Sequence, residues 1–327
     1  MLRLLTVILG LTLCWATGGI QAAGPYELPD RSRASPRPLR LLQTWSLQPP
    51  TSERFDASGL LLQTNGSLLT LNDKRAGLYR IILPPTGTVA SLIRLPGAFE
   101  PEALDAAVGR KARNYDLEGL AEDDQGRWYT CEESTRLVFR YDPRNQQTDV
   151  LRFDWSPVKR WFSRDGNASW EGLAVHGETL YLANEREVGR IVVASLGTGA
   201  VTGSFSVAPP DRPARDVHYS DLCWYGDHLW VLCRESHCVV QVNPQSERVV
   251  AAFDYSHIES DPKYGYLNPL PYGFVEGLAL APDALWLVVD NNGIGRISNP
   301  KDSRPSLWKC EIPAARTKAE PHDSPRP

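Results

Sequence analysis

Long apolar runs are scarce in this 327-residue chain, and the one that stands out lies at its start. Between Met1 and about Ala23, a basic Arg3 precedes the apolar stretch Leu4 to Ala16, and small residues follow. This pattern is typical of a cleaved secretory signal, residues 1–23, rather than of a membrane span. No later run approaches the ~20 apolar residues that a spanning helix needs. We therefore expect an exported protein, periplasmic or secreted, with no membrane span.

Basic runs and regularly spaced cysteines are also missing. The net charge is −4, which argues against a nucleic-acid partner, and we expect a monomer. Loss of Cys14 with the signal leaves an odd number of cysteines, which is not a disulfide framework. Buried strand thiols are the simpler interpretation, although one or two bridges stay possible in an oxidising compartment. The five thiols are Cys131, Cys223, Cys233, Cys238 and Cys310.

Familiar catalytic motifs are absent as well. The chain has no Gly-x-Ser-x-Gly elbow, no Cys-x5-Arg loop and no His-Glu-x-x-His helix motif. Its six histidines show no paired spacing, which disfavours zinc. A ready-made serine or cysteine nucleophile is therefore not visible.

A repeated motif takes the place of these signals. A small or acidic residue and a glycine open a short apolar strand, and a turn and an aromatic-rich strand follow. The period is roughly 50 residues, which is typical of a radial β repeat. The copies are Asp56-Ala57-Ser58-Gly59-Leu60, Asp116-Leu117-Glu118-Gly119-Leu120, Ser169-Trp170-Glu171-Gly172-Leu173, Asp221-Leu222-Cys223-Trp224-Tyr225 and Phe274-Val275-Glu276-Gly277-Leu278.

The second copy shows the expected unit most clearly. Strands are predicted over Leu117–Ala121, Arg127–Glu132, Leu137–Tyr141 and Thr148–Phe153, with turn residues between them. Four antiparallel strands make one blade of a propeller. No convincing amphipathic helix is expected between the strands.

The repeat spacing predicts an all-β fold, a five-bladed β-propeller over residues 39–313, with six blades as the alternative. Residues 24–38 are expected to be an extended lead-in and residues 314–327 a disordered tail, because neither can bury enough apolar surface. The segments Leu39–Leu47 and Ser306–Ile312 have no other partner, so we expect them to pair and close the ring.

Acidic residues recur at two positions of the repeat. One precedes the glycine and one ends the second strand, so both should converge at one mouth of the channel. Carboxylates crowded in this way need a cation, and calcium accepts six to eight oxygens in loose geometry. The alternative is that nearby basic residues neutralise the acids structurally. We predict calcium ligands from Glu118, Glu171, Glu276, Glu133 and Asp290, and the remaining second positions are Asp73, Glu185 and Glu235.

Two functions fit this mouth. The first is a binding module for a small molecule or an envelope partner, which is favoured because no nucleophile is visible. The second is a metal-dependent hydrolase of phosphoric or carboxylic esters, with Glu185 as base and Arg186 or Arg234 holding an anionic substrate. A tyrosine-rich insertion, Tyr255 to Tyr272, is placed to cover the same mouth.

The order of these motifs resembles the SdiA-regulated family of exported bacterial propellers. It is also similar to the overlapping family named for the esterase-like activity of phytase. The resemblance implies a five-bladed propeller that binds calcium, and the second family adds hydrolysis of esters. It is carried by Asp116-Leu117-Glu118-Gly119-Leu120, Trp170-Glu171-Gly172-Leu173-Ala174 with Asn184-Glu185, Ser220-Asp221-Leu222 with Arg234-Glu235-Ser236, and Gly273-Phe274-Val275-Glu276-Gly277-Leu278-Ala279.

Overall fold

A computed structural model describes residues 35–112, 114–165, 168–185, 189–210, 217–270 and 272–313. The predicted signal, most of the predicted lead-in and the predicted tail lie outside these residues, and so does Arg186. Among the residues described, strands dominate and helices are few. The expectation of an all-β fold is therefore confirmed.

The strands follow one another in groups of four, and each group forms an antiparallel run from the inside outward. The first two groups are β3 (Ala57–Leu62), β4 (Leu68–Asn72), β5 (Leu78–Ile82), β6 (Val89–Leu95), and β7 (Leu117–Glu122), β8 (Trp128–Glu132), β9 (Leu137–Asp142), β10 (Gln147–Leu151). The next two are β11 (Trp170–His176), β12 (Thr179–Asn184), β13 (Arg190–Ser195), β14 (Val201–Phe205), and β15 (Tyr219–Tyr225), β16 (His228–Cys233), β17 (Cys238–Asn243), β18 (Arg248–Asp254).

The last group joins the two ends of the chain. It consists of β19 (Val275–Ala281), β20 (Ala284–Val289), β21 (Ser306–Glu311) and the early strand β2 (Arg40–Gln48). Strand β2 pairs antiparallel with β21, which confirms the predicted pairing of the two end segments. On its other edge β2 makes a short parallel pairing with β6, so the last and first groups share one eight-stranded sheet. The short β1 (Arg37–Pro38) adds to β18.

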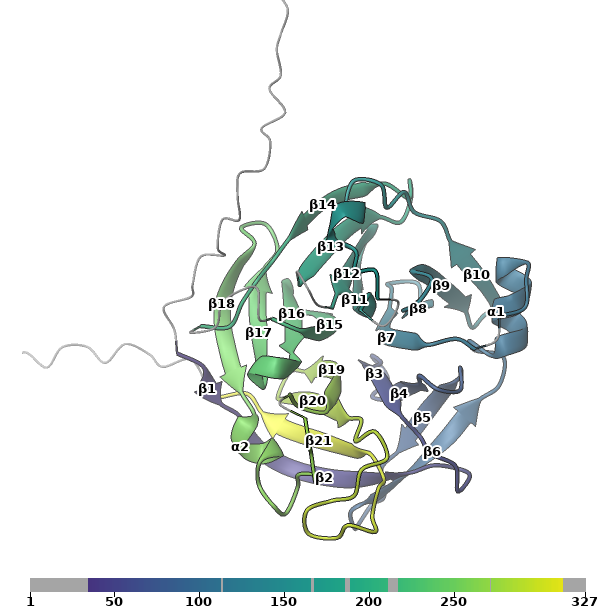
Figure 1. The fold of residues 1–327 in the computed structure, drawn as a ribbon. Coiled ribbons are helices and arrows are strands. Elements are labelled where there is room, and N and C mark those ends of the chain that lie inside the picture. The colour runs from purple at the N-terminus through teal and green to yellow at the C-terminus, as the bar shows by residue number, and fades with distance from the viewer. Residues whose placement is uncertain are drawn as a thin grey trace, which may run out of the picture.

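The groups radiate from a central axis, as Figure 1 shows. Successive first strands contact one another, β3 with β7, β7 with β11, β11 with β15, β15 with β19, and β19 with β3 again. The ring of first strands is therefore closed, and the arrangement is that of a β-propeller. Apolar side chains fill the space between neighbouring groups. For example, Trp45 and Trp286 of the last group share one core cluster with Tyr79 and Ile81 of the first group.

Glycines let the first strands approach at the axis. Gly119 has a φ of +62°, and a carbon added as a side chain there would lie 2.7 Å from the Cα of Gly172. The same test at Gly59 meets the backbone of Gly119, and at Gly277 it meets the backbone of Gly59. A crowded axis thus explains why the motif keeps a glycine.

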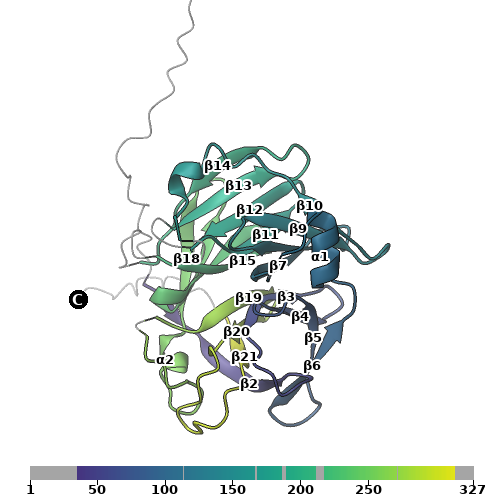
Figure 2. The same ribbon diagram turned by 45° about the vertical axis from the view of Figure 1, so that its right-hand side comes forward.

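The expectation that no amphipathic helix interrupts the strands is wrong at one place. Helix α1 (Pro101–Val108) begins with a proline in its first turn and ends at Gly109, in left-handed conformation. It buries Leu104 in the core between the first two groups and stands beside β10, as Figure 2 shows. A second, single-turn helix is α2 (Ser256–Glu259). None of the described helices has the length and apolar character needed to cross a membrane.

Candidate functional site

Each sequence repeat brings three positions to the same end of its first two strands. In the first four repeats, the residue that follows the second strand donates its backbone N–H to the carbonyl of the residue three places before the glycine position, as Glu133 does to Asp116 at 3.0 Å. In chain order the three positions hold Asp56, Ser58 and Asp73; Asp116, Glu118 and Glu133; Ser169, Glu171 and Glu185; His218, Ser220 and Arg234; and Phe274, Glu276 and Asp290.

The structure corrects the predicted alignment of the fourth repeat. Strands β15 and β19 share one irregularity in register, which falls before Asp221 in the first and before Gly277 in the second. Asp221 therefore occupies the glycine position, and Ser220 occupies the position that the sequence assigns to Cys223. The side chain of Cys223 lies farther along β15, opposite Trp230. The alignment was wrong because this repeat lacks the glycine. Asp221 was therefore equated with Asp56 and Asp116, the acids at the start of the first two copies.

Ten of these fifteen positions line one polar pocket of about 160 Å³, and the five that do not are Asp56, Ser169, His218, Ser220 and Phe274. The predicted base Glu185 and the predicted substrate arginine Arg234 line this pocket. All the predicted calcium ligands line it too, namely Glu118, Glu133, Glu171, Glu276 and Asp290. Asp116, which was not predicted as a site residue, also lines the pocket. So do Lys74, one of the basic residues beside the predicted acids, and Tyr272 of the insertion that was expected to cover the mouth. Asp116 had a visible signal, since it stands two residues before Glu118 as Asp56 stands before Ser58.

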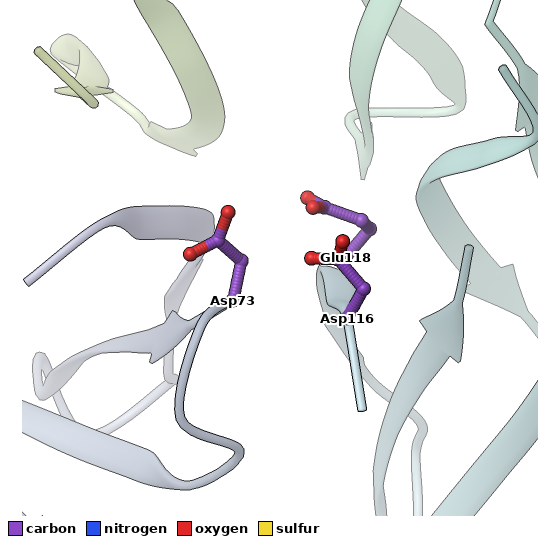
Figure 3. Close-up of side chains that lie close together, drawn as sticks. All are labelled: Asp73, Asp116 and Glu118. Atoms are coloured by element: carbon purple, nitrogen blue, oxygen red, sulfur yellow. The ribbon is translucent and has the colours of Figure 1, made fainter. Parts of the chain in front are cut away.

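The first carboxylate group of this pocket consists of Asp73, Asp116 and Glu118. One oxygen from each lies within 4.8 Å of the others, and Figure 3 shows the three side chains facing one another from two neighbouring repeats. The Lys74 ammonium lies 2.7 Å from an Asp73 oxygen and 3.7 Å from an Asp116 oxygen. The Ser58 hydroxyl donates to Glu118.

The second carboxylate group consists of Glu133, Glu171 and Glu185. Their oxygens satisfy the same 4.8 Å limit, and all three residues are buried. Glu185 N donates to the carbonyl of Ser169 at 2.8 Å, which fixes the backbone where β12 ends. Two triads thus lie on neighbouring sectors of one mouth.

Burial and mutual repulsion raise the pKa values of these acids. Burial is the main cause for Glu118, whose pKa lies well above its usual range, and Asp73 and Asp116 raise it further. Burial likewise raises the pKa of Glu171 well above its usual range, with Glu185 and Glu118 adding to the effect. For Asp73, burial outweighs the opposing charge of Lys74 and raises the pKa to about 7. A bound cation would reverse these shifts, because it favours the ionised carboxylates.

The fourth repeat contributes cationic and aromatic groups instead. Arg234, not Glu235, takes the position after its second strand, and its guanidinium contacts Glu276 and lies 3.1 Å from a Glu185 oxygen. Its Nε has no hydrogen-bond partner among the residues described. Tyr272 covers the guanidinium, with 5.3 Å from Cζ to the ring centroid.

His218 forms a second layer behind the pocket. It is almost fully buried, its Nε2 contacts Glu185, and its Nδ1 lies 2.9 Å from a Glu235 oxygen. The ring of Tyr272 packs edge-on against His218 at a centroid distance of 6.1 Å. Glu185 is therefore held from the fourth repeat by an arginine and a histidine.

Among the described residues of the insertion that was expected to cover the mouth, Tyr272 alone lines the pocket. Tyr255 and Tyr266 are buried in the core between the last two repeats. Glu259 of α2 ties the insertion down, because it accepts from the backbone N–H of Phe274 at 2.5 Å and lies 2.7 Å from His237 Nδ1. Most of the described insertion therefore packs against the core and does not line the pocket.

The donor set fits calcium. Calcium binds oxygens at about 2.3–2.6 Å, so two ligands on opposite sides of one ion lie at most about 5 Å apart. Both triads meet this limit. Asp73 Oδ1 and Glu276 Oε2 are buried and make no hydrogen bond within the described part of the chain. Buried carboxylate oxygens left in this way are uncommon unless they face an ion or water.

The family model of phytase-like proteins, described as esterase-like activity of phytase, matches residues 52–293. Glutaminyl cyclase from Myxococcus xanthus is similar in fold, with a TM-score of 0.57, 16% identity, and coverage of 85% of this chain and 97% of the cyclase. An aldose sugar dehydrogenase from Streptomyces coelicolor matches with a TM-score of 0.45, 15% identity, and coverage of 85% and 99%. No curated protein matches the chain.

Proposed function

The chain belongs to the phytase-like family, defined by the esterase-like activity of phytase, and from this premise we propose that its acidic mouth is a calcium-dependent site of ester hydrolysis. The observation that carries the proposal is the pair of buried carboxylate triads in one pocket. Acids in that arrangement stay ionised at neutral pH only beside a cation. The family description supplies the reaction class.

We assign the binding of calcium to the two triads. Asp73, Asp116 and Glu118 form one set of ligands, and Glu133 and Glu171 form the core of the other. Glu276 and Asp290 border the same pocket and complete the predicted ligand group. A calcium ion held there would supply positive charge that polarises an ester oxygen and acidifies a nearby water.

Glu185 is the proposed base. Contacts with Arg234 and His218 hold its carboxylate at the pocket wall, so it needs no rearrangement to receive a proton from water. Arg234 lines the pocket, and its positive charge favours an anionic group of the substrate there. Tyr272 shields this side of the mouth from solvent through its contact with Arg234.

A non-catalytic binding module is the second candidate. It is favoured by the state of Arg234, whose two terminal nitrogens already contact carboxylates of Glu185 and Glu276. An anionic substrate would have to compete with them. In this candidate the mouth binds calcium and a small molecule or envelope partner without turnover.

We further propose that the repeats form five blades and that the protein is exported. Four groups of consecutive strands and the group that joins both chain ends support the count. The amino-terminal pattern of residues 1–23 supports export, and the resemblance to the SdiA-regulated family stays a prediction.

Calcium binding is tested first by thermal melting. The purified protein is stripped with EDTA and melted with increasing calcium, and we expect the Tm to rise by many degrees because calcium binds only the folded state. Glu171→Gln should lose most of that rise. The exposed Glu178→Gln, the same change on the same repeat, should keep it. An unchanged Tm in calcium would contradict the site.

Hydrolysis is tested with p-nitrophenyl phosphate and p-nitrophenyl acetate. We expect turnover that requires calcium and falls at least about 100-fold in Glu185→Gln, the range over which a positioned base contributes. Calcium-dependent melting without turnover of either probe would leave the binding module as the function. Turnover that persists in EDTA would contradict the calcium-dependent reaction.

A further inference from the structure

The channel has a second mouth that the proposed reaction does not use. The glycine ring consists of Gly59, Gly119, Gly172 and Gly277, which approach the neighbouring first strands at the axis. Beyond this ring, the same five first strands line a half-open cavity of about 770 Å³. Its wall includes Leu60 and Leu62 of β3, Leu120 of β7, Trp224 of β15 and Leu280 of β19. Cavities of 300–1,000 Å³ with mostly apolar walls are the usual size and character of small-molecule sites.

The two mouths are separate chambers. The glycine backbones approach too closely to admit a side chain, and the fourth repeat places Asp221 at the axis. Its carboxylate accepts backbone N–H groups of Leu222 and Leu278 at 2.8 Å each. A molecule in the second cavity therefore does not reach the carboxylate triads.

An aromatic surface forms one side of the second cavity. Trp224 is partly exposed and stacks on His176, with 4.0 Å between ring centroids and an interplanar angle of 9°. Tyr181 supports the same indole at 5.6 Å. The stack fixes the orientation of Trp224, so the partly exposed indole offers an apolar and π-rich surface at little entropic cost.

Charge is present on the opposite rim and has one sign. Glu122, Asp123 and Asp124 line the cavity from the second repeat, and no lysine, arginine or histidine belongs to its described lining. Arg127 neutralises Asp123, with 2.6 Å between Nη2 and Oδ2. Glu122 accepts hydrogen bonds from the neutral groups Gln63 Nε2 and Trp128 Nε1, at 2.8 and 3.1 Å, so its charge is not compensated.

We propose that this second mouth binds a small hydrophobic cation. The apolar body lies against the leucines and Trp224, and the cationic group lies at the rim beside Glu122 and Asp124. The negative charge of Glu122 and Asp124 at the rim favours a cation over an anion or a neutral molecule of equal size. The proposal stands apart from the calcium site and does not require hydrolysis.

The probe is a series of alkyltrimethylammonium ions, measured by calorimetry below their micelle concentrations. Calcium is kept saturating, so that the acidic mouth is not open to the probe. We expect affinity to rise about tenfold from octyl to decyl and to be undetectable for tetramethylammonium. Decanoate, with a similar tail and the opposite charge, should bind at least tenfold more weakly than decyltrimethylammonium.

Variants locate the binding. Ala281→Trp fills the cavity and should lower affinity at least tenfold, and Thr64→Trp on the exposed rim should do the same if Ala281→Trp does not fold. Glu122→Gln should lower affinity for the cation severalfold and raise affinity for decanoate, because the carboxylate that attracts one charge repels the other. Glu102→Gln, on the exposed face of α1, should have no effect. Equal affinity for decanoate, or no loss in either tryptophan variant that folds, would overturn the proposal.

Discussion

The two ends of the channel are built from the same five strands and have opposite chemistry. The acidic mouth is small, about 160 Å³, and carboxylates dominate its lining. The other mouth is about 770 Å³ and is lined mainly by leucine, alanine and aromatic side chains. The glycine ring and Asp221 divide them. The position of a residue before or after the glycine therefore decides whether it lines the acidic mouth or the apolar mouth.

Local backbone geometry explains the sharpness of this division. Every first strand has a register irregularity at the motif, as between Glu118 and Ala121 in β7. A bulge turns the strand and redirects the side chains on either side of it. Residues before the bulge, such as Glu118, face the acidic mouth, and residues after it, such as Leu120, belong to the apolar side.

The largest effect is expected from removing the Asp221 carboxylate, which helps to separate the two mouths. Asp221→Ala should lower the free energy of unfolding by about 3 kcal/mol, because buried N–H groups of Leu222 and Leu278 lose their acceptor. Chemical denaturation measures this change. The exposed Asp283→Ala is the control and should stay within about 0.5 kcal/mol. A loss below about 1 kcal/mol for Asp221→Ala would show that the carboxylate does not hold the strands together.

The carboxylates of the two mouths should also give different dependences of stability on pH. In EDTA the folded protein holds a proton on Asp73 up to about pH 7, because burial raises that pKa, whereas the unfolded chain releases it near the ordinary value of 3.8. The folded state therefore binds more protons between those values, and stability falls as pH rises through the window. Saturating calcium should abolish this loss, because the ion favours the ionised carboxylate.

The pKa shift of Asp123, at the apolar mouth, has the opposite direction to that of Asp73. Asp123 is partly buried, yet hydrogen bonds from the Arg127 backbone and the Tyr129 hydroxyl lower its pKa below 3.8. Its stabilisation is thus present above the ordinary value and is lost only as pH falls below it. Melting in EDTA from pH 3 to 8 follows both effects. A Tm that rises steadily from pH 4 to 7 would contradict the state assigned to the acidic mouth.

The sequence was sufficient for the part of the site that repeats. The acid before each glycine and the acid after each second strand lie at fixed spacing, so their convergence follows from strand geometry alone. The pairing of the chain ends followed from the lack of other partners. The prediction failed in the fourth repeat, because Asp221 stands at the glycine position there. The register of β15 shows that Ser220 takes the position before it, and Arg234 is the residue that this repeat contributes to the pocket.

Other parts of the molecule could not be predicted because they depend on tertiary packing. Tyr272 reaches the pocket only because Glu259 anchors the insertion behind it. The apolar mouth has no motif, since leucines after a strand-opening glycine are equally suited to a closed core. Whether such residues pack or line a cavity depends on how far the five strands diverge, which no local pattern encodes.

The smallest effect comes from making one substitution at both mouths. In EDTA at pH 8, Asp73→Asn should raise the unfolding free energy by about 1 kcal/mol, because the amide removes a buried charge whose burial outweighs the attraction of Lys74. Asp124→Asn, on the exposed rim of the other mouth, should change it by less than about 0.5 kcal/mol. In calcium the sign at Asp73 should reverse, since the amide then removes a ligand, while Asp124→Asn stays neutral. Equal responses of the two variants would mean that the carboxylates of the acidic mouth are as well solvated as those of the rim, and the reason to place a cation among them would be lost.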